Sequence, residues 1–404
     1  MQPLIYALPN SDSSILLDRI QFYLDSNPSP RLIKYGFNTI NNKIDLIALT
    51  SVSYYKTGLN FDFERTDAKS IFTMGNALFN ISTFNRIFAE IWEILALFDL
   101  LNPRLVYTSN PDDVKAIFAT SRALGFTSGA PQVISDPSSL SKWVDEKGGA
   151  KGDEDDNEDE NNSDETEDEK YPSDDPNSLL NHYGGLASQP VDLIIKRYSN
   201  INLDENALIK LIIADLPKIL QLMANGTNVI IQLFNLETQT SAEIIYYLSS
   251  LFSEAYLVRP SVTSEFSDVK YLVLINTLLD PEAKKTLASS VTALSSLNKD
   301  IRDSYLISFG LEINPDVGTR IQCLNSETTP PRFKKYNRIK AYLDSKVYEG
   351  SIYDEMIQAQ DVNSDEWITT FGDIPNMKEI ADRAIAKSGE KCVKSEDIVN
   401  IFSF

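Results

Sequence analysis

One stretch of the chain brings cationic and aromatic side chains together at close spacing. It reads TPPRFKKYNRIKAY over residues 329–342. Lysine and arginine bind phosphate and an aromatic ring stacks on a base, so this composition suits single-stranded RNA. An amphipathic helix that starts at Pro330–Pro331 and turns a basic face to water explains the pattern equally well. The candidate RNA-binding residues are Arg332, Phe333, Lys334, Lys335, Tyr336, Arg338 and Lys340.

Other catalytic side-chain types are scarce. His182 is the only histidine, which excludes a metal site built from several histidines. Two cysteines, Cys323 and Cys392, provide neither a disulfide framework nor a metal cluster, and this favours a reducing compartment. No Gly-Lys-Ser/Thr phosphate-binding motif occurs. With no apolar run of transmembrane length, we expect an intracellular, cytoplasmic protein without a membrane partner.

The negative charge is concentrated in one block. Residues 145–175 hold 16 acidic and 3 basic residues, so they contribute −13 of the net −21 and leave −8 for the rest. This block has almost no apolar side chains to bury, and its like charges repel one another. We therefore expect a disordered acidic insertion over 145–176. The remaining charge is low enough to allow a local RNA-binding face.

The elements that would position a site follow an α/β pattern. Residues 228–275 predict a strand, a helix capped by Thr240 or Ser241, and two further strands. Upstream, the apolar spacing predicts helices over 83–101 and 205–223, with strands over 105–108, 132–134 and 191–195. Helices are also expected over 281–297 and 301–309. A buried strand, a helix and a closing pair of strands indicate an α/β sheet.

The central run also carries a family resemblance. Residues 229–274 read VIIQLFNLETQTSAEIIYYLSSLFSEAYLVRPSVTSEFSDVKYLVL. This run resembles the last third of FtsJ-type (RrmJ-like) ribose 2′-O-methyltransferases, and it is closest in pattern to the mRNA cap-1 enzymes of eukaryotes and large DNA viruses. Phe234, Arg259–Pro260, Ser267 and Tyr271 hold the frame. The resemblance implies a Rossmann-like methyltransferase fold with an antiparallel closing strand.

The same resemblance implies where catalysis would occur. The family uses a Lys-Asp-Lys-Glu tetrad, and the matching positions here hold Glu90, Arg197, Gln232 and Val269. Arginine stays protonated and glutamine does not titrate, so neither can serve as a base. The family's glycine-rich cofactor turn is replaced by Ser109–Asp113, which has no glycine. We expect neither a catalytic tetrad nor a bound cofactor.

The resulting hypothesis divides the chain into three parts. An N-terminal extension covers 1–75, the methyltransferase-like domain covers 76–279, and a helical extension covers 280–404. The predicted function is a catalytically inactive scaffold, RNA-binding or stimulatory subunit of an RNA-capping or transcription assembly, with protein partners and possible RNA contact. Its location would be the cytoplasm, a viral factory or a virion. One alternative is an active S-adenosylmethionine-dependent cap 2′-O-methyltransferase, and a second is a structural or virion protein that reuses the fold.

Overall fold

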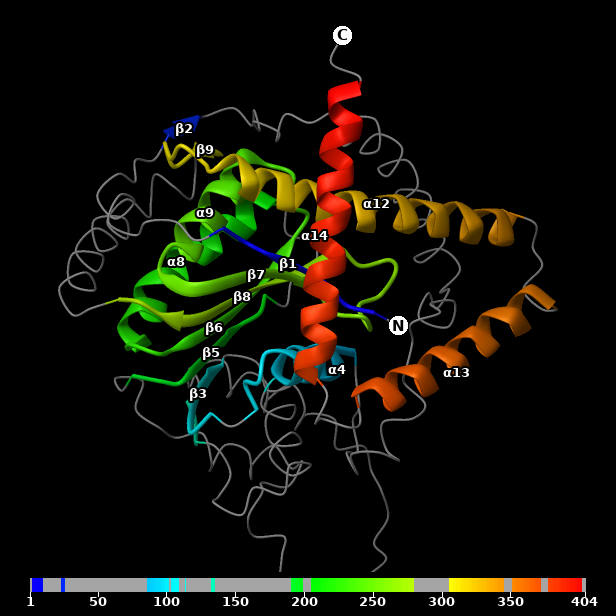
Figure 1. Ribbon diagram of the computed structural model, residues 1–404, viewed down its shortest axis with the longest axis horizontal. Helices are drawn as coiled ribbons and strands as arrows, with labels where there is room; N and C mark the ends of the chain where they lie inside the picture. Colours follow the sequence, from blue (N-terminus) through cyan, green and yellow to red (C-terminus); the bar gives the residue numbers. More distant parts are fainter. Residues whose placement is uncertain are drawn as a thin grey trace, which may run out of the picture.

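A computed structural model shows how these segments are arranged (Figure 1). It describes residues 2–9, 23–25, 86–101, 103–108, 113, 132–134, 190–198, 205–279, 305–344, 351–371 and 377–401. The acidic insertion at 145–176 and the helix expected over 281–297 lie outside these residues. Among the helices of the described ranges, none is long and apolar enough to cross a membrane.

The centre of the molecule is a seven-stranded mixed sheet with the order β1-β7-β8-β6-β5-β3-β4. Strands β4, β3, β5 and β6 are mutually parallel, and β8 runs antiparallel between β6 and β7. Five strands therefore point one way, while β8 and β1 point the other. The predicted α/β class is confirmed, and the arrangement is compatible with a Rossmann-like fold. The bounds are β1 Leu4–Ala7, β3 Leu105–Thr108, β4 Gln132–Ile134, β5 Leu193–Lys196, β6 Asn228–Phe234, β7 Phe252–Arg259 and β8 Val269–Thr277.

Helices cover both faces of this sheet (Figure 1). Helix α4, Arg86–Leu97, lies on one side, and α8, Glu205–Leu222, and α9, Gln239–Ser249, lie on the other. The predicted cap of α9, Thr240 or Ser241, is wrong by two or three residues, because the side chain of Thr238 accepts the hydrogen bond from the Ser241 amide. The carboxylate of Glu205 also accepts from the Glu237 and Thr238 amides, which ties the starts of α8 and α9 together.

The described N-terminal strands pair with distant parts of the chain. Strand β1 extends the sheet by pairing with β7, and β2, Tyr23–Asp25, pairs with β9, Tyr305–Ser308, in a separate two-stranded sheet. The helix predicted over 301–309 is therefore wrong. Burial alternates along β9 with a period of two, as a half-buried strand requires, and pairing with β2 satisfies its backbone.

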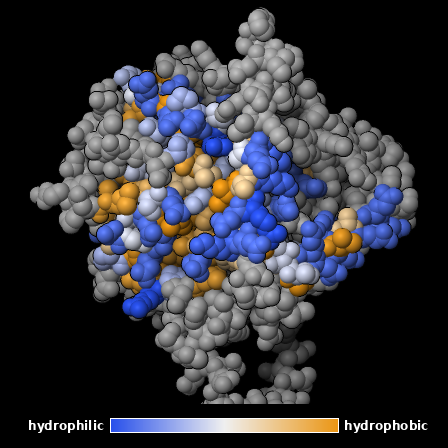
Figure 2. All heavy atoms as spheres, in the orientation of Figure 1, coloured by the Kyte–Doolittle hydropathy of each residue, from blue (hydrophilic) through white to orange (hydrophobic). Residues whose placement is uncertain are grey.

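Three long helices follow β9. They are α12, Pro315–Asp344, α13, Ser351–Phe371, and α14, Met377–Ile401. Helix α12 begins well before Pro330–Pro331 and continues through both prolines, so the prediction that these prolines start a helix is wrong. Helix α14 crosses β1, and the described side chains of α13 and α14 present a largely hydrophilic surface (Figure 2).

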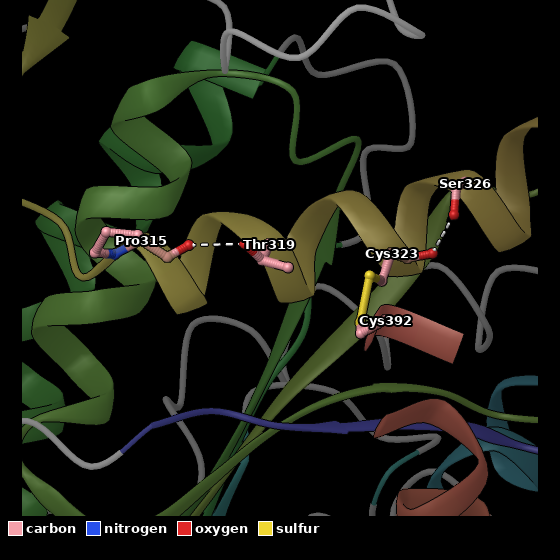
Figure 3. Close-up of a disulfide and its surroundings, with 5 residues drawn as sticks. All are labelled: Pro315, Thr319, Cys323, Ser326 and Cys392. Atoms are coloured by element: carbon pink, nitrogen blue, oxygen red, sulfur yellow. Dashed lines mark hydrogen bonds between the residues drawn. A yellow bond between two sulfur atoms is a disulfide. The ribbon is translucent and has the colours of Figure 1, made fainter. Parts of the chain in front are cut away.

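A disulfide joins two of these helices (Figure 3). Cys323 on α12 and Cys392 on α14 are bonded, with their Cα atoms 5.7 Å apart. The expectation that the two cysteines provide no disulfide is therefore wrong. Their separation of 69 residues hides the pairing from the sequence, because only the packing of α14 on α12 brings them together.

Candidate functional site

Polar side chains gather on one face of the sheet, near the carboxyl ends of β3, β5 and β6. The register of the paired strands places these side chains next to one another. Thr108 lies opposite Ile195, two residues before Arg197, and Gln232 lies opposite Tyr271. Because residues two apart share a face, Thr108 and Arg197 point to the same side. We call this set the buried polar cluster, and its members are Glu90, Thr108, Asp113, Arg197, Gln232 and Tyr271.

An ion pair occupies the middle of the buried polar cluster. The Arg197 Nε lies 2.5 Å from Asp113 Oδ1, and the two side chains are 3% and 0% exposed. The Thr108 hydroxyl donates to the other oxygen, Asp113 Oδ2, at 2.8 Å. Asp113 is helical and follows β3 in the chain, and Arg197 follows β5. The pair therefore joins the two segments in which the resemblance implied a cofactor turn and a catalytic carboxylate.

Helix α4 contributes a second buried carboxylate. The Tyr271 hydroxyl donates to Glu90 Oε2 at 2.6 Å, and both residues are buried. Burial raises the pKa of the Tyr271 phenol well above its usual value, and the nearby Glu90 carboxylate raises it further. The tyrosine therefore remains a neutral hydrogen-bond donor at neutral pH. Glu90 on α4 therefore holds the side chain of Tyr271 on β8.

Gln232 is also committed to the protein's own backbone. Its Oε1 accepts a hydrogen bond from the Tyr198 amide at 3.0 Å, directly after Arg197. Burial, followed by the Asp215 carboxylate, raises the pKa of Tyr198 well above its usual value. The three positions Glu90, Arg197 and Gln232, which the sequence aligned with a catalytic tetrad, therefore lie together in space. Each is held by a partner within the chain.

The fourth position, Val269, begins β8 and is buried. Its neighbour Lys270 lies on the opposite face of the strand from Tyr271. The Lys270 Nζ donates to Asp268 Oδ1 at 2.8 Å and to the Asn235 carbonyl at 3.2 Å. Burial lowers the pKa of Lys270, although Asp268 opposes that shift. Lys270 therefore lies outside the buried polar cluster, on the other face of β8.

One of the predicted RNA-binding residues takes part in the same local network. Arg332 on α12 is buried, and its NH1 lies 2.9 Å from Asp268 Oδ1. Burial opposes ionisation of Asp268, but Lys270 and then Arg332 outweigh it and hold the pKa of this carboxyl below its usual range. Arg332 thus anchors α12 to the start of β8. The side chains of Phe333, Lys334, Lys335, Tyr336, Arg338 and Lys340 lie outside the described residues.

The turn between β6 and α9 is fixed by α12 as well. Asn235 and Leu236 adopt left-handed backbone conformations, with φ of 62° and 65°. A leucine in this region is uncommon and needs support from its surroundings. The Asn325 side chain of α12 supplies it by donating from Nδ2 to the Leu236 carbonyl at 2.9 Å. Lys270 holds the adjacent carbonyl, so α12 and β8 together define this turn.

Sequence reasoning missed two partners in the buried polar cluster. The sequence placed Asp113 only within the glycine-free segment Ser109–Asp113, and Tyr271 only in the family frame. The sequence did contain a signal for this contact. Arg197 stands where the family has an aspartate, and Asp113 stands in the segment that replaces the cofactor turn, so the two charges are complementary. Pairing them would have suggested the ion pair between Arg197 and Asp113.

Comparison with known proteins adds one relationship. No protein-family model matches the chain. The "Uncharacterized protein R383" of Acanthamoeba polyphaga mimivirus is 34% identical over 416 residues, and the alignment covers 100% of both chains.

Proposed function

The chain belongs to the same family as the mimivirus protein R383, and we propose its role from the geometry of the site. The relative itself has no assigned function from which a role could be taken. The chain is a catalytically inactive, methyltransferase-like protein. It serves as a scaffold, RNA-binding or stimulatory subunit of an RNA-capping or transcription assembly. We propose an RNA-capping or transcription assembly because residues 229–274 resemble cap 2′-O-methyltransferases. A relative from a large virus supports a place in the infected cytoplasm, a viral factory or the virion.

The sheet supports the finer assignment of a methyltransferase fold. Such a sheet is mostly parallel and closes with an antiparallel strand, and β8 has that place between β6 and β7. The buried polar cluster also lies at the carboxyl ends of parallel strands, where open α/β sheets bind ligands. The resemblance and the strand order therefore agree.

The observation that carries the inactive assignment is the ion pair between Arg197 and Asp113. Transfer of a methyl group to a ribose hydroxyl requires a group that removes or polarises its proton. Arg197 stays protonated at any relevant pH, and its charge is already neutralised by Asp113. Because Arg197 is already paired with Asp113, it is also not available to bind the carboxylate of the cofactor's methionine end. The contact between Arg197 and Asp113 therefore opposes both removal of the ribose proton and binding of the cofactor.

Calorimetric titration of S-adenosylmethionine into the full chain tests this assignment. We expect no measurable heat of binding, because the Arg197 charge that could hold the cofactor carboxylate is already neutralised by Asp113. An active cap 2′-O-methyltransferase titrated under the same conditions serves as the positive control. Saturable one-to-one binding at micromolar cofactor would overturn the inactive assignment and favour an active enzyme that uses S-adenosylmethionine.

A second measurement separates an RNA-binding subunit from a structural protein that reuses the fold. Lys334→Glu with Lys335→Glu reverses two charges of the basic-aromatic stretch on α12. If this stretch binds RNA, affinity for a capped oligonucleotide falls at least about tenfold and the salt dependence becomes shallower. Lys378→Glu with Lys387→Glu makes the same charge change at exposed positions of α14 and leaves binding near the wild-type level. An absence of salt-dependent binding in the wild type would favour the structural alternative.

A further inference from the structure

We propose that Cys323 and Cys392 form a redox-dependent latch that fastens residues 386–392 of α14 onto α12. The two cysteines come from helices far apart in the chain, and both are buried, at 4% and 1% exposure (Figure 3). Their Cα separation of 5.7 Å lies in the range that a disulfide spans. This inference does not depend on the proposed function.

The packing of α14 differs between its two halves. Its buried positions recur at helical spacing through Met377, Ala381, Ala384, Ser388 and Cys392. The first half adds the partly buried Ile380 and Ile385, which pack against the hydrophobic core. Residues 386–392 bury only a serine and a cysteine. Since stabilisation by burial follows apolar area, residues 386–392 adhere weakly without the covalent bond.

Polar contacts do not compensate for this weak packing. Lys391 pairs with Glu327 at 2.6 Å, with the two side chains 40% and 26% exposed, and Lys387 donates to Gln2 at 2.6 Å from an exposed position. Exposed ion pairs contribute little to stability. Gly389 also lies in the middle of the helix, where glycine weakens helical structure. A Cβ added at Gly389 would meet no atom within 4 Å, so packing does not demand this glycine.

The latch closes by thiol–disulfide exchange with a small-molecule disulfide. One cysteine thiolate attacks the small disulfide, forms a mixed disulfide and releases one thiolate. The second cysteine thiolate then attacks the bonded cysteine sulfur and releases the second. Two electrons pass from the cysteines to the small disulfide, and the two cysteine protons end on the released thiols. Excess dithiol reverses the sequence and opens the latch.

Opening the latch has a local consequence. Helix α14 crosses β1 and packs on α12 (Figure 1). Release of residues 386–392 therefore uncovers part of β1, which is an edge strand of the sheet, and the α12 surface around Cys323. The strands β6 and β8 lie deeper in the sheet and keep their pairing. The oxidised and reduced proteins thus differ in the surface that they offer.

Hydrogen exchange followed by mass spectrometry tests this on the full chain. The protein is equilibrated with glutathione disulfide or with a phosphine reductant. We expect exchange in 386–392 to be at least about tenfold faster after reduction, with a smaller increase in 2–9 and none in β6 or β8. Cys323→Ser with Cys392→Ser should match the reduced protein under both conditions. Gly389→Ala should slow exchange in the reduced protein by strengthening the helix.

Alkylation with iodoacetamide reports the thiols directly. After glutathione disulfide treatment, neither cysteine should be modified in the denatured protein. If both cysteines are still alkylated, the disulfide does not form and the proposal fails. If the disulfide forms but reduction leaves exchange in 386–392 unchanged, the bond is not a latch and the proposal fails as well.

Discussion

The guanidinium of Arg197 is joined to the carboxylate of Asp113 inside the protein, 2.5 Å from Nε to Oδ1. The first residue follows β5 and the second follows β3, so the contact bridges the ends of adjacent parallel strands. Thr108 completes it from β3. The buried polar cluster therefore contains a closed, internally neutral contact between the ends of two adjacent strands.

Substitution of Arg197 alone should be strongly destabilising. Arg197→Met leaves the Asp113 carboxylate buried without its counter-charge, and such a loss costs about 3–5 kcal/mol. Urea unfolding followed by circular dichroism measures the free energy of unfolding. The double variant Arg197→Met with Asp113→Leu removes both charges and should recover most of the loss. A loss below about 1 kcal/mol in the single variant would show that the pair is not buried as described.

Tyr271 should make the protein sensitive to alkaline pH. Its pKa is raised by burial, so above the usual value of 10.0 the unfolded chain loses the phenolic proton before the folded chain does. The stability contribution is complete below that pH and falls as pH rises, by up to about 1.4 kcal/mol per pH unit for one group. Tyr271→Phe should make this decline shallower. Urea unfolding from pH 9 to 11 measures it, and identical slopes in both proteins would contradict the prediction.

Helix α13 should depend on one tryptophan for its attachment. Trp367 is buried and donates from Nε1 to Glu93 Oε2 at 3.2 Å, while Trp92 donates to the Phe371 carbonyl. Trp367→Ala should cost about 3–5 kcal/mol and speed hydrogen exchange along α13. Thr369→Ala on the exposed side of the same helix should change stability by no more than about 0.5 kcal/mol. Equal effects of the two substitutions would argue against this anchor.

The disulfide should contribute to global stability in oxidising buffer. Closing a loop of 69 residues lowers the entropy of the unfolded chain, which corresponds to about 4 kcal/mol in the loop-entropy model. Cys323→Ser with Cys392→Ser should lose stability on that scale. In reductant, the variant and the wild type should unfold at similar urea concentrations. A variant as stable as the oxidised wild type would show that the bond adds nothing.

The central part of the fold was predictable because its signals are local. The apolar run that forms β6, the helical spacing of α9 and the extended segment before Pro260 occur within 48 residues. The strand order adds what local patterns cannot, namely that β8 inserts antiparallel between β6 and β7. Strand β9 was mistaken for a helix because its partner, β2, lies far away in the sequence.

The site was only partly predictable for the same reason. The resemblance indicated that Glu90, Arg197 and Gln232 would lie near one another, and the structure places them in one cluster. The resemblance did not identify the side chains and backbone groups with which these three residues pair. Whether a buried arginine faces a substrate or an internal carboxylate depends on the position of Asp113, 84 residues earlier. The disulfide and the burial of Arg332 also depend on long-range packing, which spacing along the chain does not encode.

A methyl-transfer assay tests the central claim most directly. The full chain is incubated with S-adenosylmethionine carrying a labelled methyl group and with capped RNA, at protein concentrations equal to the RNA. The account predicts no label in the RNA above the level of a protein-free control, while an active cap 2′-O-methyltransferase labels it fully. Label at the ribose 2′ oxygen in proportion to the amount of this protein would contradict the account.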